Sequence, residues 1–104
     1  MNKTLKNTKL DIDVLQIKKA ALIIRAINHK LRQQMLKLID DYEKITVTEL
    51  YINLRLEQSV ASQHLAILRK AGFVKATRQG KFIFYSVNYE RFDKVNDLIE
   101  KFLK

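Results

Sequence analysis

Short polar side chains gather in one stretch of the chain, where they could touch the edges of nucleic-acid bases. The stretch reads QSVASQH at residues 58–64. The amide of Gln63 can form two hydrogen bonds with an adenine edge, the hydroxyl of Ser62 suits a base or a phosphate, and the side chain of Val60 can contact a thymine methyl group. This stretch therefore predicts recognition of base edges in duplex DNA.

Basic residues follow the same stretch and suggest contacts to phosphate. Residues 58–89 contain five Lys and Arg residues and no Asp or Glu. The whole chain has twenty Lys and Arg against eleven Asp and Glu, which leaves a net charge of +9. A surplus of this size favours a polyanionic partner. We predict that the DNA contacts come from Gln58, Ser59, Val60, Ser62, Gln63, His64, Arg69, Lys70, Arg78 and Lys81.

Two helices must position these residues. The sequence TVTE at residues 46–49 matches a capping box, so a short helix begins there and ends near Arg55. A second helix is expected over residues 58–71, with Gly72 as a left-handed cap after its last turn. Two helices joined by a turn of about three residues are typical of a helix-turn-helix.

A β-hairpin is expected directly after the helix pair. Residues 73–78 and 81–87 are rich in β-branched and aromatic side chains, and Gln79 and Gly80 between them suit a two-residue loop. Arg78 and Lys81 flank the expected tip, where they would reach a phosphate or a minor groove. A helix-turn-helix followed by such a hairpin is a winged helix-turn-helix.

The first and last helices carry more apolar residues than one small core needs. Residues 10–27 have apolar positions on two sides of the expected helix, and residues 92–103 repeat them at helical spacing. A spare apolar side most simply meets a second copy of the chain. We predict a homodimer through Leu10, Val14, Ile17, Ala21, Ile24, Phe92, Val95, Ile99 and Phe102.

These elements predict a mainly α fold with a β-hairpin wing and about five helices. Asn28 is expected to cap the second helix, and a short strand is expected at residues 45–47. The apolar stripe of that second helix is expected at Leu31, Met35, Leu38 and Ile39. Residues 10–104 form a single winged helix-turn-helix domain in this prediction, and the sequence leaves open whether the basic tail before it, residues 1–9, is ordered.

Composition argues against several other classes of protein. The chain has no cysteine, and no charge-free stretch long enough to span a membrane, so we expect a cytoplasmic protein without disulfides or thiolate metal sites. His29 and His64 lie far apart in the sequence, so no metal or other cofactor is predicted. Asp40, Asp41 and Glu43 fit a solvated helix end better than an acid–base pair, and no GxSxG motif occurs, so no enzyme is predicted.

A longer run of residues matches a known pattern. Residues 59–74 read SVASQHLAILRKAGFV, which fits SxxSxHLxxLRxAGxV, and a Gly-Lys pair follows at residues 80–81. Residues 28–36 are similar to a DPTRLRIL segment, with Arg32 at its arginine. Over about residues 20–88 the chain resembles winged-helix repressors of the ArsR/SmtB type. The resemblance implies a homodimer that reads an inverted-repeat operator with the second helix of the pair and the wing, and that joins through its first and last helices.

The chain departs from this family at its sensing positions. Metal-sensing members have ELCxC where residues 49–53 here read ELYIN, and others use Asp and His on the last helix, where this chain has Asp93, Asp97 and Glu100 without a His. His29 and Glu57 replace a proline and a capping serine of the family, so both helix starts are expected to be less sharply fixed. The inducing signal stays open between a small organic ligand, a partner protein, a non-thiol metal site and none.

The sequence thus predicts a sequence-specific regulator of transcription, specifically a dimeric repressor bound to duplex DNA. Two other functions stay open. One is a winged-helix module that binds another protein, and its affinity for DNA would respond little to salt. The other is a nucleoid-type DNA binder that recognises shape and not sequence.

Overall fold

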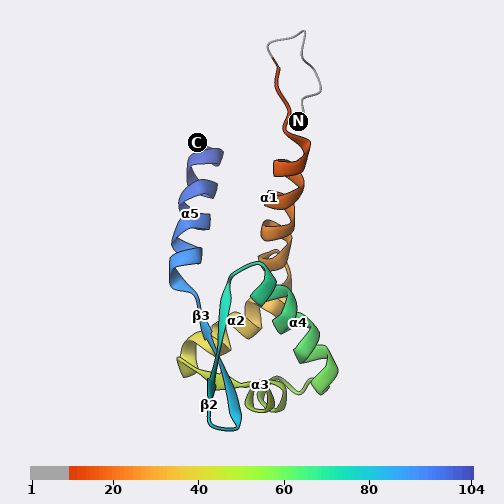
Figure 1. The fold of residues 1–104 in the computed structure, drawn as a ribbon, viewed down its shortest axis with the longest axis vertical. Helices are drawn as coiled ribbons and strands as arrows, with labels where there is room; N and C mark the ends of the chain where they lie inside the picture. The colour runs from red at the N-terminus through yellow and green to blue at the C-terminus, as the bar shows by residue number, and fades with distance from the viewer. Residues whose placement is uncertain (1–9) are drawn as a thin grey trace.

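Five helices and a three-stranded antiparallel sheet make up residues 10–104, the part of the chain that this computed structural model describes. In chain order the elements are α1 (Val14–Ile27), α2 (Lys30–Tyr42), β1 (Ile45–Thr46), α3 (Val47–Leu54), α4 (Gln58–Lys70), β2 (Val74–Gln79), β3 (Phe82–Val87) and α5 (Tyr89–Leu103) (Figure 1). The predicted winged helix-turn-helix is confirmed, including the short first strand. The predicted basic tail, residues 1–9, lies outside the described residues.

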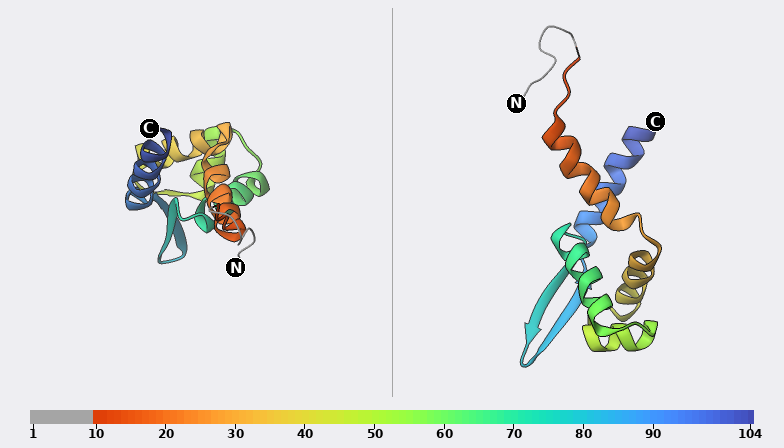
Figure 2. Two further views of the ribbon diagram at one scale, coloured as in Figure 1. Left: turned by 90° about the horizontal axis from the view of Figure 1, so that it is seen from above. Right: turned by 90° about the vertical axis from the view of Figure 1, so that its right-hand side faces the viewer.

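The elements form a body from which two helices project. α2, α3, α4 and the hairpin of β2 and β3 lie together, whereas α1 and α5 extend from one end of that body (Figures 1 and 2). In the sheet, β3 is the central strand, and β1 and β2 pair with it antiparallel on either side. None of the helices within residues 10–104 is long and apolar enough to cross a membrane.

The core lies where α2, α3, α4 and the base of the hairpin meet. Met35 and Ile39 of α2 are fully buried, as the predicted stripe requires, and Leu50 of α3 is buried with them. Leu31 and Leu38 were expected in the same stripe but are only half-buried at its edge. The helix therefore turns a slightly different side inward from the one predicted.

Local hydrogen bonds fix the start of α3 as the sequence predicts. The Thr46 hydroxyl accepts a hydrogen bond from the Glu49 amide at 3.2 Å, and the Glu49 carboxylate accepts one from the Thr46 amide at 3.0 Å. This is the predicted capping box. Arg55 ends the helix in the left-handed conformation, with φ +56°, so the chain turns at once toward α4.

The end of α4 is equally well defined. The amides of Gly72 and Phe73 donate to the carbonyls of Arg69 at 3.0 Å and Leu68 at 2.9 Å, which is the pattern of a Schellman motif. Gly72 has φ +87°, a conformation that a side chain would strain. The predicted left-handed cap at Gly72 is confirmed.

Two predicted helix starts are wrong by a few residues. α1 begins at Val14 and not at Leu10, because the Asp13 carboxylate accepts a hydrogen bond from the Gln16 amide at 3.1 Å and caps the helix there. His29, and not Asn28, caps α2. Its ring nitrogen Nδ1 accepts from an amide of the first turn, so the replacement of the family's proline does not leave this helix start without a cap.

The hairpin loop is shifted by one residue from the prediction. Gln79 pairs with Phe82, so the two loop residues are Gly80 and Lys81 and not Gln79 and Gly80. Gly80 has φ +62°, whereas Lys81 has no positive φ. Glycine at the first loop position is the preference of a type II′ turn, while the prediction assumed glycine at the second position.

Arg32 is the one charged side chain of residues 10–104 that is buried, with 6% of its surface exposed. Its guanidinium donates three hydrogen bonds: from Nε to the Ala26 carbonyl at 2.6 Å, from one terminal nitrogen to the Arg25 carbonyl at 3.0 Å, and from the other to Nδ1 of His64 at 3.1 Å. The two carbonyls lie in the last turn of α1, where the helix dipole favours a cation. The side chain therefore joins the end of α1 to both α2 and α4.

We expect Arg32→Met to destabilise the fold by about 3 kcal/mol, because it leaves three acceptors without their donor in a largely buried place. Lys37→Met on the exposed side of the same helix should change the free energy of unfolding by less than about 0.5 kcal/mol. Urea denaturation of the two variants and the parent measures both values. Equal losses for the two variants would show that the three hydrogen bonds contribute nothing net.

Candidate DNA-binding surface

The exposed side of α4 presents most of the residues predicted to contact DNA. Ser59, Ser62 and Gln63 are exposed in its first half, and Arg69 and Lys70 are exposed in its last turn. Val60 is half-buried, so only part of its side chain faces outward. The helix thus shows neutral hydrogen-bonding groups near its start and cations near its end.

The start of α4 offers a further feature that suits a phosphate. Glu57 is the N-cap residue, but its side chain makes no capping hydrogen bond. The first amides of an α-helix have no partner within the helix, and the helix dipole adds positive charge there. A DNA phosphate is the kind of acceptor that such amides bind.

A groove separates α4 from the hairpin. It has a volume of about 410 Å³, and its walls are formed by Val47, Ser62, Leu65, Ala66, Arg69, Lys70 and Tyr85. Ser62 and Arg69 of α4 thus face Tyr85 of β3 across a shallow space. Helix and wing form one concave surface, which is the shape needed to contact a base edge and a neighbouring phosphate together.

The register of the hairpin sorts its basic residues onto two faces. Ala76 pairs with Tyr85 and Arg78 pairs with Ile83, so Arg78 lies on the same face as Tyr85, toward α4. Lys75 pairs with Ser86 and therefore lies on the opposite face. The five basic residues within residues 58–89 therefore do not form one surface, because Lys75 points away from the groove.

Lys81 occupies the loop of the hairpin, where it is exposed. Its ammonium group lies 5.5 Å from the centre of the Phe82 ring, close enough for a cation–π contact. The loop is the most distant part of the wing from the core (Figure 2). This position suits a contact to the DNA backbone beyond the groove that α4 enters.

Lys44, for which no role was predicted, contacts the face of the wing that points away from α4. Its ammonium group donates a hydrogen bond to the Gln79 amide oxygen at 3.0 Å and lies 4.9 Å from the centre of the Phe84 ring. Both partners are on the same face as Lys75. The only sequence signal for this role is a lysine directly before the first strand, which does not reveal its partners.

His64 differs from the other predicted contact residues because it faces the protein. Its ring accepts the hydrogen bond from Arg32 and lies 5.0 Å, centre to centre, from the ring of His29. An arginine can only donate, so Nδ1 of His64 must be unprotonated, and the ring is neutral. Partial burial lowers the pKa of His64, and the neighbouring His29 and Arg32 lower it further. We therefore leave His64 out of the DNA-contacting surface.

The predicted dimer residues separate into an exposed group and a buried group. Val14, Ile17, Ala21 and Ile24 on α1 are exposed. On α5, Phe102 is 86% exposed, and Leu98 and Leu103, which the prediction omitted, are exposed beside it. Val95 is only 7% exposed and packs in the protomer's own core.

Phe92 and Ile99 are likewise turned toward the protomer. Both are half-buried and pack against the core, and the Phe92 ring lies 4.7 Å from that of Phe73. α5 therefore holds the protomer together with the side that carries Phe92, Val95 and Ile99, and leaves Leu98, Phe102 and Leu103 exposed. Leu10 is also exposed, but it precedes α1.

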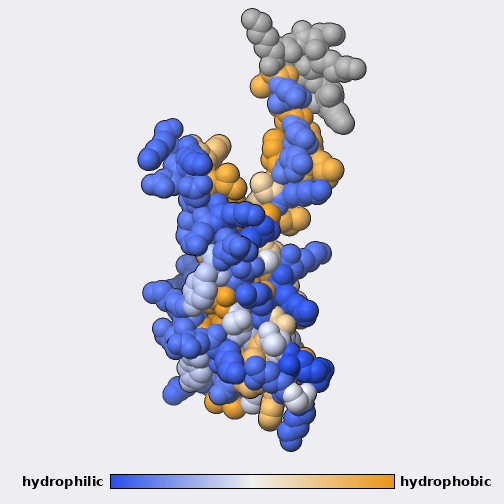
Figure 3. Space-filling model, turned by 60° about the vertical axis from the view of Figure 1, so that its left-hand side comes forward, coloured by the Kyte–Doolittle hydropathy of each residue, from blue (hydrophilic) through white to orange (hydrophobic). Residues whose placement is uncertain are grey.

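A large apolar groove runs between α1 and α5. Its volume is about 630 Å³, and its lining is Ala20, Ile23, Ile24, Arg91, Lys94, Val95, Leu98, Ile99, Lys101 and Phe102. Figure 3 shows apolar side chains along α1 and on the side of α5 that faces it. Exposed apolar surface of this extent is typical of an interface between protein chains.

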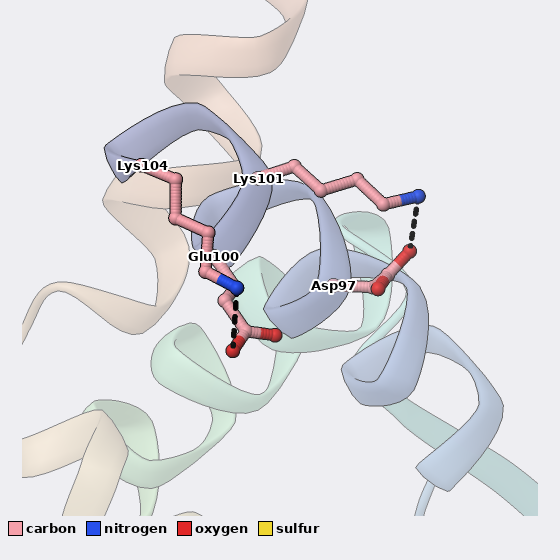
Figure 4. A network of polar contacts seen from close by, with 4 residues as sticks. All are labelled: Asp97, Glu100, Lys101 and Lys104. Carbon is pink, nitrogen blue, oxygen red and sulfur yellow. Dashed lines mark ion pairs between the residues drawn. The ribbon is translucent and has the colours of Figure 1, made fainter.

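The carboxylates at the end of α5 are paired with lysines. Asp97 lies 3.2 Å from the ammonium group of Lys101, and Glu100 lies 3.9 Å from that of Lys104 (Figure 4). All four side chains are well exposed, so each pair stabilises the helix by less than about 1 kcal/mol. Within residues 10–104, no three His, Cys, Asp or Glu residues come together as a metal site would require.

Comparison with known proteins gives the same fold and points to one family. Residues 29–76 match the family model described as "Bacterial regulatory protein, arsR family". The HTH-type transcriptional regulator MJ1325 of Methanocaldococcus jannaschii is 34% identical over 83 residues, which are 80% of this chain and 93% of that protein. The transcriptional activator HlyU of Vibrio cholerae is 32% identical over 80% of this chain and 76% of its own length.

A solved structure agrees with the sequence comparisons. The transcriptional repressor PagR of Bacillus anthracis superimposes with a TM-score of 0.65 and 29% identity over 88% of this chain and 100% of its own. The match extends beyond the helix-turn-helix, because it covers most of the described elements.

The neutral ring of His64 makes the stability depend on pH. The pKa of His64 is lower in the folded state than in the unfolded state. The contribution of its neutral ring to the free energy of unfolding is therefore complete above about pH 6.5, and it is lost as the pH falls through the pKa of the folded state. We expect the parent to lose more stability than His64→Gln between about pH 7.5 and about pH 5.5, since a glutamine oxygen can accept from Arg32 without titrating. Urea denaturation at both pH values measures the difference. Identical pH dependence in the two proteins would contradict the assignment.

Proposed function

Because the chain belongs to the arsR family of bacterial regulatory proteins, which are winged helix-turn-helix regulators of transcription, we propose that it acts as a dimeric repressor on an inverted-repeat DNA site. The observation that carries the proposal is the surface shared by α4 and the wing. It combines neutral groups of α4 that can read bases with cations that can bind phosphate, among them Arg78 on the face of the hairpin toward α4 and Lys81 in the hairpin loop.

The proposed reading element is the first half of α4, inserted in the major groove. Ser59, Ser62 and Gln63 carry hydroxyl and amide groups that can pair with base edges. Their short side chains let the helix backbone approach the bases closely. Contacts of this type determine sequence preference, whereas contacts to phosphate do not.

The proposed phosphate contacts surround the reading element. Arg69 and Lys70 lie at the end of α4, Arg78 lies on the face of the hairpin toward α4, and Lys81 lies in the loop. The amides at the start of α4 complete the set. Cations that neutralise phosphates release counterions, so the affinity should fall steeply as salt is raised.

The proposed dimer forms through the exposed apolar residues of α1 and α5. A two-fold dimer presents two copies of α4, and winged helices of this kind meet half-sites about 34 Å apart. The groove between α1 and α5 supports this arrangement because it leaves a large apolar surface that a second copy would cover.

We propose repression because a dimer bound across a promoter excludes polymerase from the same DNA. The similar proteins include both a repressor, PagR, and an activator, HlyU, so the position of the site relative to the promoter decides the outcome. We place the protein in the cytoplasm, where the DNA of a bacterium is, and assign it no catalytic role.

Variants of α4 and the hairpin separate base contacts from phosphate contacts. We expect Gln63→Ala to weaken binding to a duplex selected by the protein roughly 10- to 100-fold and to affect a scrambled duplex little. Lys81→Ala should weaken both duplexes alike and reduce the salt slope by about 1. Lys75→Ala is the matched control, because it lies on the other face of the hairpin and should leave the slope unchanged. Fluorescence anisotropy at several salt concentrations measures all of these values.

Three results of that experiment would contradict the proposal. A parent protein whose affinity hardly changes with salt would favour a module that binds another protein. Equal affinity for selected and scrambled duplexes would favour a nucleoid-type binder. Identical behaviour of Gln63→Ala and Lys81→Ala would show that the two residues do not have separate roles.

The dimer is tested independently of DNA. Light scattering at micromolar concentration should give twice the chain mass of 12.3 kDa. We expect Phe102→Asp to shift the protein to the monomer, because it places a charge at the centre of the apolar surface of α5. Gln34→Asp, at an exposed polar position of α2, is the control and should stay dimeric. A parent protein at the monomer mass would remove the dimer from the proposal.

A further inference from the structure

A second groove adjoins the first and shares Ile23 and Arg91 with it, and it lies where α1 meets the end of α4 and the start of α5. Its volume is about 410 Å³, within the range of about 300 to 1,000 Å³ usual for small-molecule sites. Its lining is Lys19, Leu22, Ile23, Ala26, Ile67, Lys70, Ala71 and Arg91. Neither its floor nor its rim includes any residue of the predicted dimer interface.

The floor of this groove is apolar and remains accessible to solvent. Leu22 of α1 is 60% exposed and Ile67 of α4 is 42% exposed, and Ile23 of α1 is half-buried against the core. Two helices thus expose large apolar side chains to one shared groove. A ligand with a hydrocarbon body would remove this surface from water.

The rim of the groove is positively charged. Lys19, Lys70 and Arg91 contribute cations, and the lining contains no Asp or Glu. The ion pairs found within residues 10–104 involve none of these three cations. The apolar floor and the cationic rim of the groove are together complementary to an anion that carries an apolar chain.

Arg91 has the best-defined position of the three cations. Its Nε donates to the Ala71 carbonyl at 2.9 Å, which holds the guanidinium at the edge of the groove. Within residues 10–104 its two terminal nitrogens make no further hydrogen bond. A guanidinium held in this way can donate two parallel bonds to one carboxylate.

We propose that this groove binds an amphipathic carboxylate, such as a medium-chain fatty acid, with the chain on Leu22, Ile23 and Ile67 and the carboxylate on Arg91 and Lys19. The carbonyls at the end of α4 do not repel the anion strongly, because Gly72, Phe73 and Arg91 already donate hydrogen bonds to them. The regulatory consequence, though not the binding itself, rests on the proposed function.

The same arginine connects the groove to the DNA-reading helix. A Cβ atom on Gly72 would lie 3.0 Å from Nε of Arg91, so the guanidinium packs directly on the turn that ends α4. Asn88 at the start of α5 also donates to the Gly72 carbonyl at 2.9 Å. A bound carboxylate that moves the guanidinium of Arg91 away from this turn therefore changes the contacts that fix the end of α4. Binding of ligand and binding of DNA must affect one another equally.

Direct titration of the full chain with decanoate, below its micelle concentration and without DNA, tests the site. Calorimetry should detect binding of decanoate, but not of decanol, which lacks the charge, or of acetate, which lacks the chain. We expect Lys19→Gln to weaken decanoate about threefold and Leu22→Gln about tenfold. Lys18→Gln, a neighbouring exposed lysine outside the groove, is the matched control and should leave the affinity unchanged. Arg91→Gln would also remove the Ala71 bond, so the two surface variants decide the test.

The outcomes separate this site from its alternatives. Equal binding of decanol would overturn the role of the cations, and absence of decanoate binding would overturn the site. Loss of binding in Lys101→Gln but not in Lys19→Gln would place decanoate in the groove between α1 and α5, against the proposal. Decanoate binding by a protein that does not bind DNA would support the site and contradict only the proposed function.

The coupling to DNA has its own test. Bound decanoate should shift the affinity of the parent protein for duplex DNA but not the affinity of Leu22→Gln. Equal shifts in the two proteins would contradict the coupling.

Discussion

The guanidinium of Arg32 joins three helices, because it extends from α2 and donates hydrogen bonds to α1 and α4. It is a buried charge without a carboxylate partner among residues 10–104, and such a charge is costly unless hydrogen bonds satisfy it. Carbonyls at the end of α1 and the ring of His64 provide those bonds. Because His64 belongs to α4, one side chain joins the first helix to the helix proposed to read DNA.

A second connection holds the end of α4, whereas His64 lies near its middle. Asn88, the N-cap of α5, donates a hydrogen bond to the Gly72 carbonyl, and Arg91 of α5 donates one to the Ala71 carbonyl. Both carbonyls lie directly after the last turn of α4. α4 is therefore attached to α1 through Arg32 and to α5 through these two residues. Since α1 and α5 carry the exposed apolar surface, the geometry of a dimer would be transmitted directly to the distance between two copies of α4.

The sequence predicted the features that depend on neighbouring residues and missed those that depend on distant ones. The capping box at Thr46 and the left-handed cap at Gly72 are local, and both are confirmed. The bond between Arg32 and His64 joins residues 32 positions apart, so no local pattern reveals it. His64 was therefore assigned to the DNA surface, although its helix position only places it beside the apolar stripe.

The one-residue shift of the hairpin loop shows how a small local ambiguity alters the site. Glycine suits either position of a two-residue loop, and the two choices differ in turn type and in the residues that pair across the hairpin. Side chains of a strand alternate between its faces, so Arg78 shares the face of Tyr85 and Lys75 lies on the other in either pairing. What the observed pairing changes is that Lys81 lies in the loop and not in the strand, and that Ile83 and not Lys81 lies opposite Arg78. The basic residues counted together in the sequence thus have different surroundings. Positive charge along this region supplies affinity for a polyanion, whereas the alternation of side chains along the wing decides which of those charges lie on the same side as the neutral residues of α4.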